Sequence, residues 1–178
     1  MLGLDERVRV AARRFSVNDE TPPRAFLAAL VSLLPVSAWR EDGDSLETED
    51  PLEMFLTSCT RPSTTRQTTW ETTGVVEGLL IRVTCTAQDP YWAYDHHRDG
   101  ALELTGWEAW ARPVAQIVAL ELASAELRTP SNAGMFTSVQ WVVHFPDTEV
   151  RLPPEGTASS RDDELVASIM DHLRSGRQ

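Results

Sequence analysis

The N-terminal part of the chain contains two stretches whose apolar residues recur at helical spacing. From Leu4 to Phe15 an apolar residue returns every three or four positions, between acids at the start and arginines at the end, which predicts a surface helix. From Pro22 to Leu34 almost every residue is apolar, which predicts a second helix that is buried on most sides. Pro35 ends this helix, because proline cannot continue the backbone hydrogen bonding.

Beyond residue 60 the apolar and polar positions alternate, as they do in strands. Pairs of threonines recur between residues 64 and 73, and residues 75–87 alternate cleanly, so we predict a hairpin that turns at Gly74. Later alternating stretches predict a short strand at 102–104, a long one at 116–127, and a second hairpin formed by residues 135–145 and 149–152.

Three more segments are predicted to be helical. A capping pattern at Asp50, Pro51 and Glu53 predicts a short helix that extends to about residue 60. Trp107 and Trp110 are spaced as on one helical turn. Near the C-terminus, a capping box opens a final helix with one apolar stripe.

Together these patterns predict an α+β fold, with N-terminal helices followed by a bent antiparallel sheet of about five or six strands closed by a C-terminal helix. This succession resembles that of pleckstrin-homology-like domains, in element order alone. We expect a helical segment over residues 1–60 with an acidic loop at 41–50, and a sheet plus helix over residues 61–178, within one compact domain.

The composition narrows the possible chemistry. The 178 residues include 27 acids and 16 bases, a net charge of -11, which disfavours both nucleic acids and anionic membrane surfaces as partners. All sixteen bases are arginines, a habit typical of GC-rich bacterial genomes. The absence of lysine excludes mechanisms that need a Schiff-base or phosphate-loop lysine.

The two cysteines belong to no metal or redox motif. Cys59 and Cys85 are not part of a C-x-x-C pair, and the alternation around Cys85 predicts a buried, reduced thiol. The apolar stretch at 25–36 leads to a small-x-small sequence like that of a signal-peptidase site. Because the preceding residues are rich in acids and have a helical pattern, we expect a cytoplasmic protein instead.

The charge is concentrated between residues 41 and 53, where seven acids occur. Asp42, Asp44 and Glu53 match three positions of a calcium-binding loop, but Glu47 stands where the sharp turn requires glycine. We therefore interpret this segment as an acidic loop that attracts a basic partner. The candidate partner-binding acids are Glu41, Asp42, Asp44, Glu47, Glu49 and Asp50.

A second cluster could bind a divalent metal. Asp95, His96 and His97 form a tripeptide similar to the signature of a family of metal-dependent phosphoesterases, and Asp99 follows closely. In that family the tripeptide follows a buried apolar strand, whereas here it follows an aromatic loop. We therefore interpret the cluster as a solvated loop, with a metal site as the alternative.

Four aromatic residues lie near this loop. They could line a ligand pocket or anchor a protein interface, and are candidate partner-binding residues, but we favour the interpretation that they fill the core or close the open end of a sheet. They are Trp92, Tyr94, Trp107 and Trp110.

No complete catalytic motif is present in the sequence, and no cofactor is implied. The leading hypothesis is a non-enzymatic binding or regulatory protein, such as an immunity protein, an inhibitor or a secretion chaperone, that engages a basic protein. The alternative is a small-molecule-binding or metal-dependent enzyme that uses the Asp95–Asp99 loop and the neighbouring aromatic residues. A third possibility is a dimer formed through the threonine-rich hairpin, which predicts a long unprotected edge strand.

Overall fold

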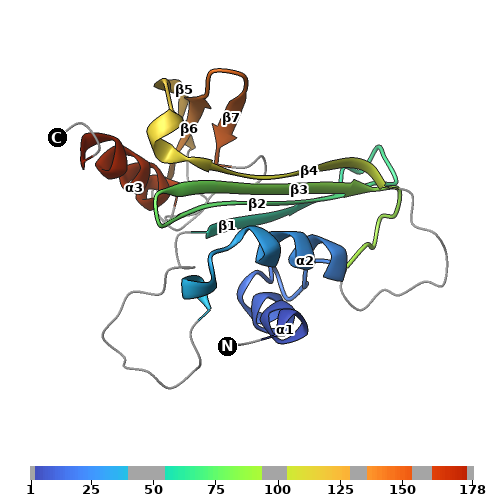
Figure 1. Cartoon of the computed structure of the whole chain (residues 1–178). Coiled ribbons are helices and arrows are strands. Elements are labelled where there is room, and N and C mark those ends of the chain that lie inside the picture. The colour runs from blue at the N-terminus through green and yellow to red at the C-terminus, as the bar shows by residue number, and fades with distance from the viewer. Residues whose placement is uncertain (1–2, 40–54, 94–103, 129–135, 154–161, 176–178) are drawn as a thin grey trace.

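The computed structural model describes residues 3–39, 55–93, 104–128, 136–153 and 162–175. Within these ranges the chain forms three α-helices and two antiparallel sheets, one of four strands and one of three (Figure 1). The predicted α+β class, N-terminal helices, antiparallel pairing and C-terminal helix are confirmed. The described strands number seven and are divided between two sheets, which refines the single sheet of five or six strands expected from the alternation.

The first sheet is a meander in which each strand pairs with the next one along the chain. Its hairpin between the second and third strands turns at Glu77 and Gly78, whose φ angles of 49° and 73° suit the right-handed twist of a two-residue hairpin. The predicted turn at Gly74 is therefore wrong, because Gly74 lies inside a strand opposite Phe55. The strands are β1 (Phe55–Thr60), β2 (Thr68–Val76), β3 (Leu79–Ala87) and β4 (Leu104–Pro113).

Two predicted helical segments are strands instead. Residues 55–60 form β1 because Phe55 and Leu56 bury their side chains on opposite faces of the sheet, in two different cores. The turn predicted at Trp107 and Trp110 lies within β4, which runs unbroken through Gly106. In both places pairing with a neighbouring strand overrides the local helical pattern.

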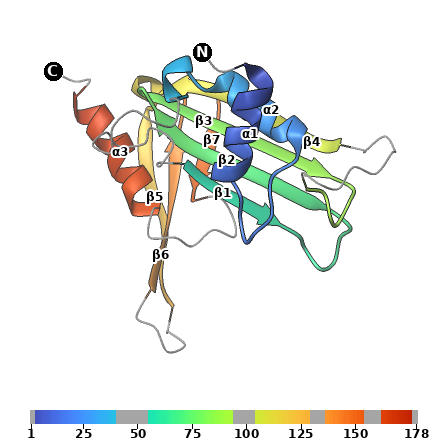
Figure 2. The same cartoon turned by 90° about the horizontal axis from the view of Figure 1, so that it is seen from below.

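The lower face of the first sheet is covered by α1 (Leu4–Arg14) and α2 (Arg24–Leu33), as Figure 2 shows from below. Phe26, Leu27, Leu30 and Val31 of α2 are fully buried in this first core. They pack against the lower side of the sheet, which contributes Trp70 among other residues.

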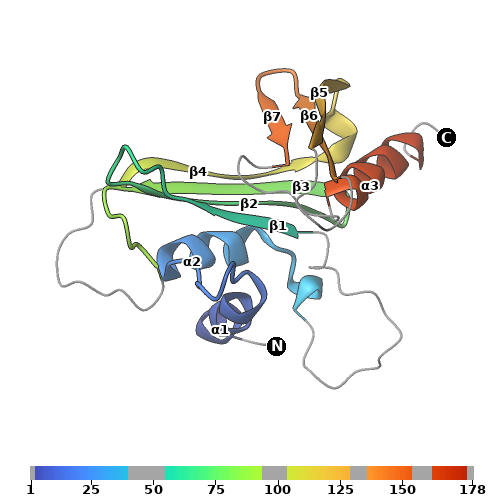
Figure 3. The ribbon, with the colours of Figure 1, turned by 180° about the vertical axis from the view of Figure 1, so that it is seen from behind.

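The second sheet lies over one end of the upper face, with the C-terminal helix beside it (Figures 1 and 3). A second core fills the space between these elements and the first sheet. Leu80 of β3 and Ile169 of the helix are both fully buried there. The elements are β5 (Ala119–Arg128), β6 (Phe136–His144), β7 (Glu149–Leu152) and α3 (Asp162–Ser175).

Four of the described strands are edge strands: β1 and β4 in the first sheet, and β5 and β7 in the second. β4 pairs only with β3, and β5 pairs only with β6. The threonine-rich hairpin β2–β3 is interior to its sheet, so the edge strand that the sequence predicted for this hairpin is wrong, because β1 and β4 pair with its two sides.

Candidate functional site

Most of the predicted binding residues lie outside the described part of the chain. This holds for the acidic residues Glu41, Asp42, Asp44, Glu47, Glu49 and Asp50. It also holds for Tyr94 and for the possible metal ligands Asp95, His96, His97 and Asp99. Trp92, Trp107 and Trp110 are described, and their surroundings differ.

The three tryptophans do not gather in one place. Trp92 is buried in the first core, where its carbonyl oxygen accepts a hydrogen bond of 2.7 Å from Nε1 of Trp70. Trp107 and Trp110 are three residues apart in β4, so they lie on opposite faces of the sheet. Trp107 is opposite Cys85 on the lower face and is 47% exposed, which leaves it accessible to a partner.

Trp110 helps to join the two sheets. Its ring meets the Phe145 ring edge-on, with centroids 5.9 Å apart. The guanidinium of Arg112 lies 5.4 Å from the centroid of Trp110 and 5.3 Å from that of Phe145, and it donates a hydrogen bond of 2.9 Å to Asp147. This hydrogen bond lowers the pKa of Asp147. The cluster therefore fixes the β6–β7 turn against β4.

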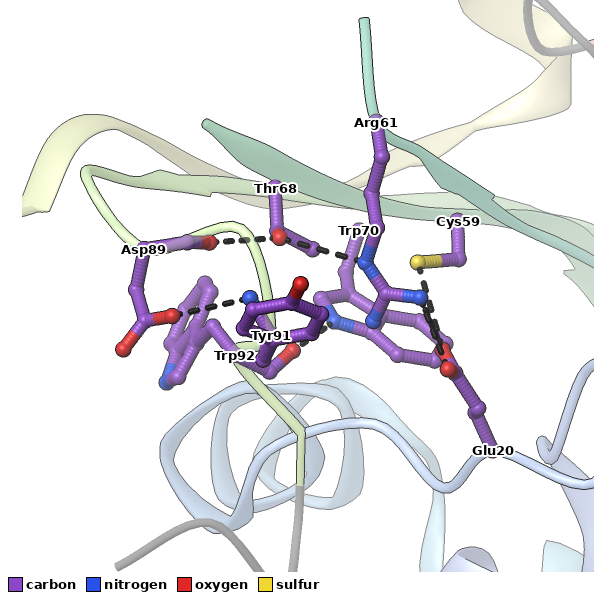
Figure 4. A network of polar contacts seen from close by, with 8 residues as sticks. All are labelled: Glu20, Cys59, Arg61, Thr68, Trp70, Asp89, Tyr91 and Trp92. Carbon is purple, nitrogen blue, oxygen red and sulfur yellow. Dashed lines mark hydrogen bonds and ion pairs between the residues drawn. The ribbon is translucent and has the colours of Figure 1, made fainter. Parts of the chain in front are cut away.

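A polar network lies where β1 ends, β2 begins and β3 ends (Figure 4). Arg61 donates to Glu20 at 2.7 Å, and Thr68 donates to the carbonyl oxygen of Asp89 at 2.6 Å. The sulfur of Cys59 lies 4.0 Å from the same Glu20 carboxylate. Burial raises the pKa of Cys59 to about 11, so at neutral pH this thiol is protonated and a poor nucleophile. Through Glu20, the network connects the loop between α1 and α2 to the first sheet.

A second set of charges lies on the upper face of the first sheet. Nε of Arg82 donates to Glu71 at 3.0 Å, and Nη1 lies 3.8 Å from Glu108. Glu108 in turn accepts a hydrogen bond of 2.8 Å from Nε1 of Trp110. The guanidinium is thus shared between two carboxylates, an arrangement that fixes the side chains of three neighbouring strands.

The described residues offer no metal centre. No group of three or more histidine, cysteine or acidic side chains converges among them. His144 has carboxylates on both sides, with Nε2 3.1 Å from Glu121 and Nδ1 3.9 Å from Glu149. Because the two carboxylates face different ring nitrogens, these residues do not surround one ligand position.

An apolar cavity of about 270 Å³ lies between the start of β5 and α3. It is lined by four consecutive residues, from Ile117 to Leu120, together with Met170, Leu173 and Arg174 of the helix. Val118, which immediately precedes β5, is 64% exposed, and Leu122 within β5 is 52% exposed. Apolar side chains are therefore accessible both at the cavity and further along β5.

Sequence reasoning missed this cavity. Its residues were predicted to be a strand and a helix, but their pattern does not show that the two elements stand apart. A weak signal is present in α3, where Met170 follows Ile169 and widens the apolar stripe beyond the buried side.

Comparisons with known proteins add no assignment: no family model, curated protein or solved structure matches this chain. Among the described helices, none has the length and apolar character needed to cross a membrane.

Proposed function

We propose that the protein is a non-enzymatic binding or regulatory domain that takes up an extended basic segment of a partner protein at the edge of β5. The observation that carries this proposal is the apolar cavity between the start of β5 and α3, beside a strand that pairs on one side only among the described strands.

The shape of the cavity suits side chains of a peptide. Its volume of about 270 Å³ is just below the range of roughly 300 to 1,000 Å³ typical of small-molecule sites. An extended peptide that pairs with a sheet edge gains backbone hydrogen bonds, and its alternate side chains can enter pockets beside that edge. Here Val118 just before β5, Leu120 on the strand and Leu173 on the helix would contact an apolar side chain.

Charge favours a basic partner. The chain carries a net charge of -11, with seven acids between residues 41 and 53, and such a field steers cations toward the protein. Arg174, at the cavity, pairs with Asp171 at 3.1 Å, so it adds no unbalanced positive charge there. An immunity protein, an inhibitor or a secretion chaperone would use such a surface.

The test is a binding titration with short peptides that alternate valine with either lysine or glutamate. We expect the lysine peptide to bind at low salt and to weaken at high salt, because exposed charges are screened. V118R should weaken binding of the lysine peptide, since its long side chain covers apolar lining of the cavity and its positive charge repels the lysines.

The matched control is V36R, which alters another exposed valine, 53% accessible, in the short helical turn Val36–Ala38, outside the cavity lining. It should bind as the wild type does. Equal binding of both peptides, salt-independent binding, or unchanged binding by V118R would contradict the proposal.

A further inference from the structure

We propose that two copies of this chain associate through antiparallel pairing of their β4 strands, with the two-fold axis at Trp110. This inference is independent of the peptide site, which lies on the second sheet. The partner is a second copy because the sequence of β4 complements itself.

The outer edge of β4 is available for pairing with another strand. β4 is ten residues long, pairs with β3 on one side, and meets no other described strand on the second side. Its backbone groups on that side can pair with another strand. Leu104 and Trp107 of the same strand are 46% and 47% exposed, which adds apolar surface along this edge.

The charges of β4 fit one register of such a strand pair. In an antiparallel pair across a two-fold axis, the residues that face each other lie at equal distances on either side of the central residue. With Trp110 at the centre, Glu108 of one copy faces Arg112 of the other, and this pair occurs twice. Ala109 faces Ala111, whose small side chains let the lower faces approach.

Neighbouring registers lack this complementarity. An axis at Glu108 places two glutamates opposite each other, which is unfavourable. An axis at Ala109 places Glu108 opposite Trp110, and an axis at Ala111 places Arg112 opposite Trp110, so neither register pairs opposite charges. Among these four registers, the one centred on Trp110 is therefore the one that pairs opposite charges.

The charged side chains are accessible to this pairing. Both lie on the upper face of the sheet, where the side chain of Glu108 is 48% exposed and that of Arg112 is 26% exposed. Arg112 already binds Asp147 and lies over the ring of Trp110, which holds the guanidinium in place at the edge. Pairing costs little side-chain entropy when a group is already positioned.

The test is the molar mass of the intact protein, measured by sedimentation over a range of concentrations. The wild type should reach twice the chain mass of 19.9 kDa. E108R and R112E should each remain monomeric, because each places like charges opposite each other. An equimolar mixture of the two variants should recover dimers, since every facing pair is then of opposite charge.

The control variant is E164R on α3, which changes an exposed acid away from β4 and should dimerise as the wild type does. Circular dichroism confirms that each variant is folded. Should a variant not fold, hydrogen exchange of the wild type decides: the amides of residues 107–112 that point away from β3 should become more protected as concentration rises. A monomeric wild type, dimers in both single variants, or a mixture that stays monomeric would overturn the proposal.

Discussion

Gly74 illustrates how a single position depends on its cross-strand neighbour. It lies opposite Phe55 in the β1–β2 pair, and a methyl group added at Gly74 would overlap the Phe55 ring. We expect G74A to lower the free energy of unfolding by about 1–3 kcal/mol, because the ring must leave its place in the first core. Urea unfolding measures this change.

Gly106 provides the matched control. It also lies within a strand, but an added methyl group would meet Thr86 at an ordinary contact distance of 3.6 Å. G106A should therefore change the free energy of unfolding by no more than about 0.5 kcal/mol. Equal losses in both variants would contradict the role given to Phe55.

The buried thiols predict a dependence of stability on alkaline pH. Burial raises the pKa of Cys85 to about 12, from an ordinary value of 9.0. Below pH 9 the thiol is protonated in both folded and unfolded chains. Between about pH 9 and pH 12 only the unfolded chain releases this proton, so the free energy of unfolding should fall as pH rises. Urea unfolding of wild type and C85A across this window should show a shallower slope for the variant, and equal slopes would contradict this effect of burial.

At the scale of elements, helices with long apolar stripes and strands with clean alternation were predictable. α1, α2, β3, β6, β7 and α3 all follow their patterns closely. β1 and β4 were not, because each has a local helical pattern that pairing with a neighbouring strand overrides. In β4 the tryptophan spacing that predicted a helical turn instead places two rings on opposite faces of a sheet.

The candidate binding surface was less predictable than the elements. The alternation in β5 predicted a strand, but alternation alone does not reveal whether an apolar residue is covered. Val118 lines the cavity and is exposed, because α3 packs into the second core through Leu165 and Ile169 and leaves a gap beside the start of β5. Such a gap depends on how two distant elements meet, and it is absent from the pattern of either one.

At the scale of the whole molecule, the first sheet belongs to two cores at once. Leu80 and Ile81 are neighbours in β3 and both are fully buried. Leu80 points into the second core and Ile81 into the first core. We expect L80A and I81A each to lower the free energy of unfolding by about 2–5 kcal/mol within one cooperative transition. Far-ultraviolet circular dichroism and tryptophan fluorescence should report coincident curves.

Two separate transitions would contradict this coupling, most clearly if each variant shifted only one of them. A surface substitution such as V36D serves as the reference, because it changes neither core.

The meander of the first sheet also bears on how the chain folds during synthesis. Each of its strands pairs with the one made just before it, so sheet formation closes only short loops and does not wait for distant segments. The residues of the first core all precede β5, so this core can form while the rest of the chain is still being synthesised. The upper surface around Leu56, Val75 and Leu80 is fully covered only when α3 emerges last. During that interval the growing chain exposes the apolar upper face of the first sheet, and it is then most prone to aggregation.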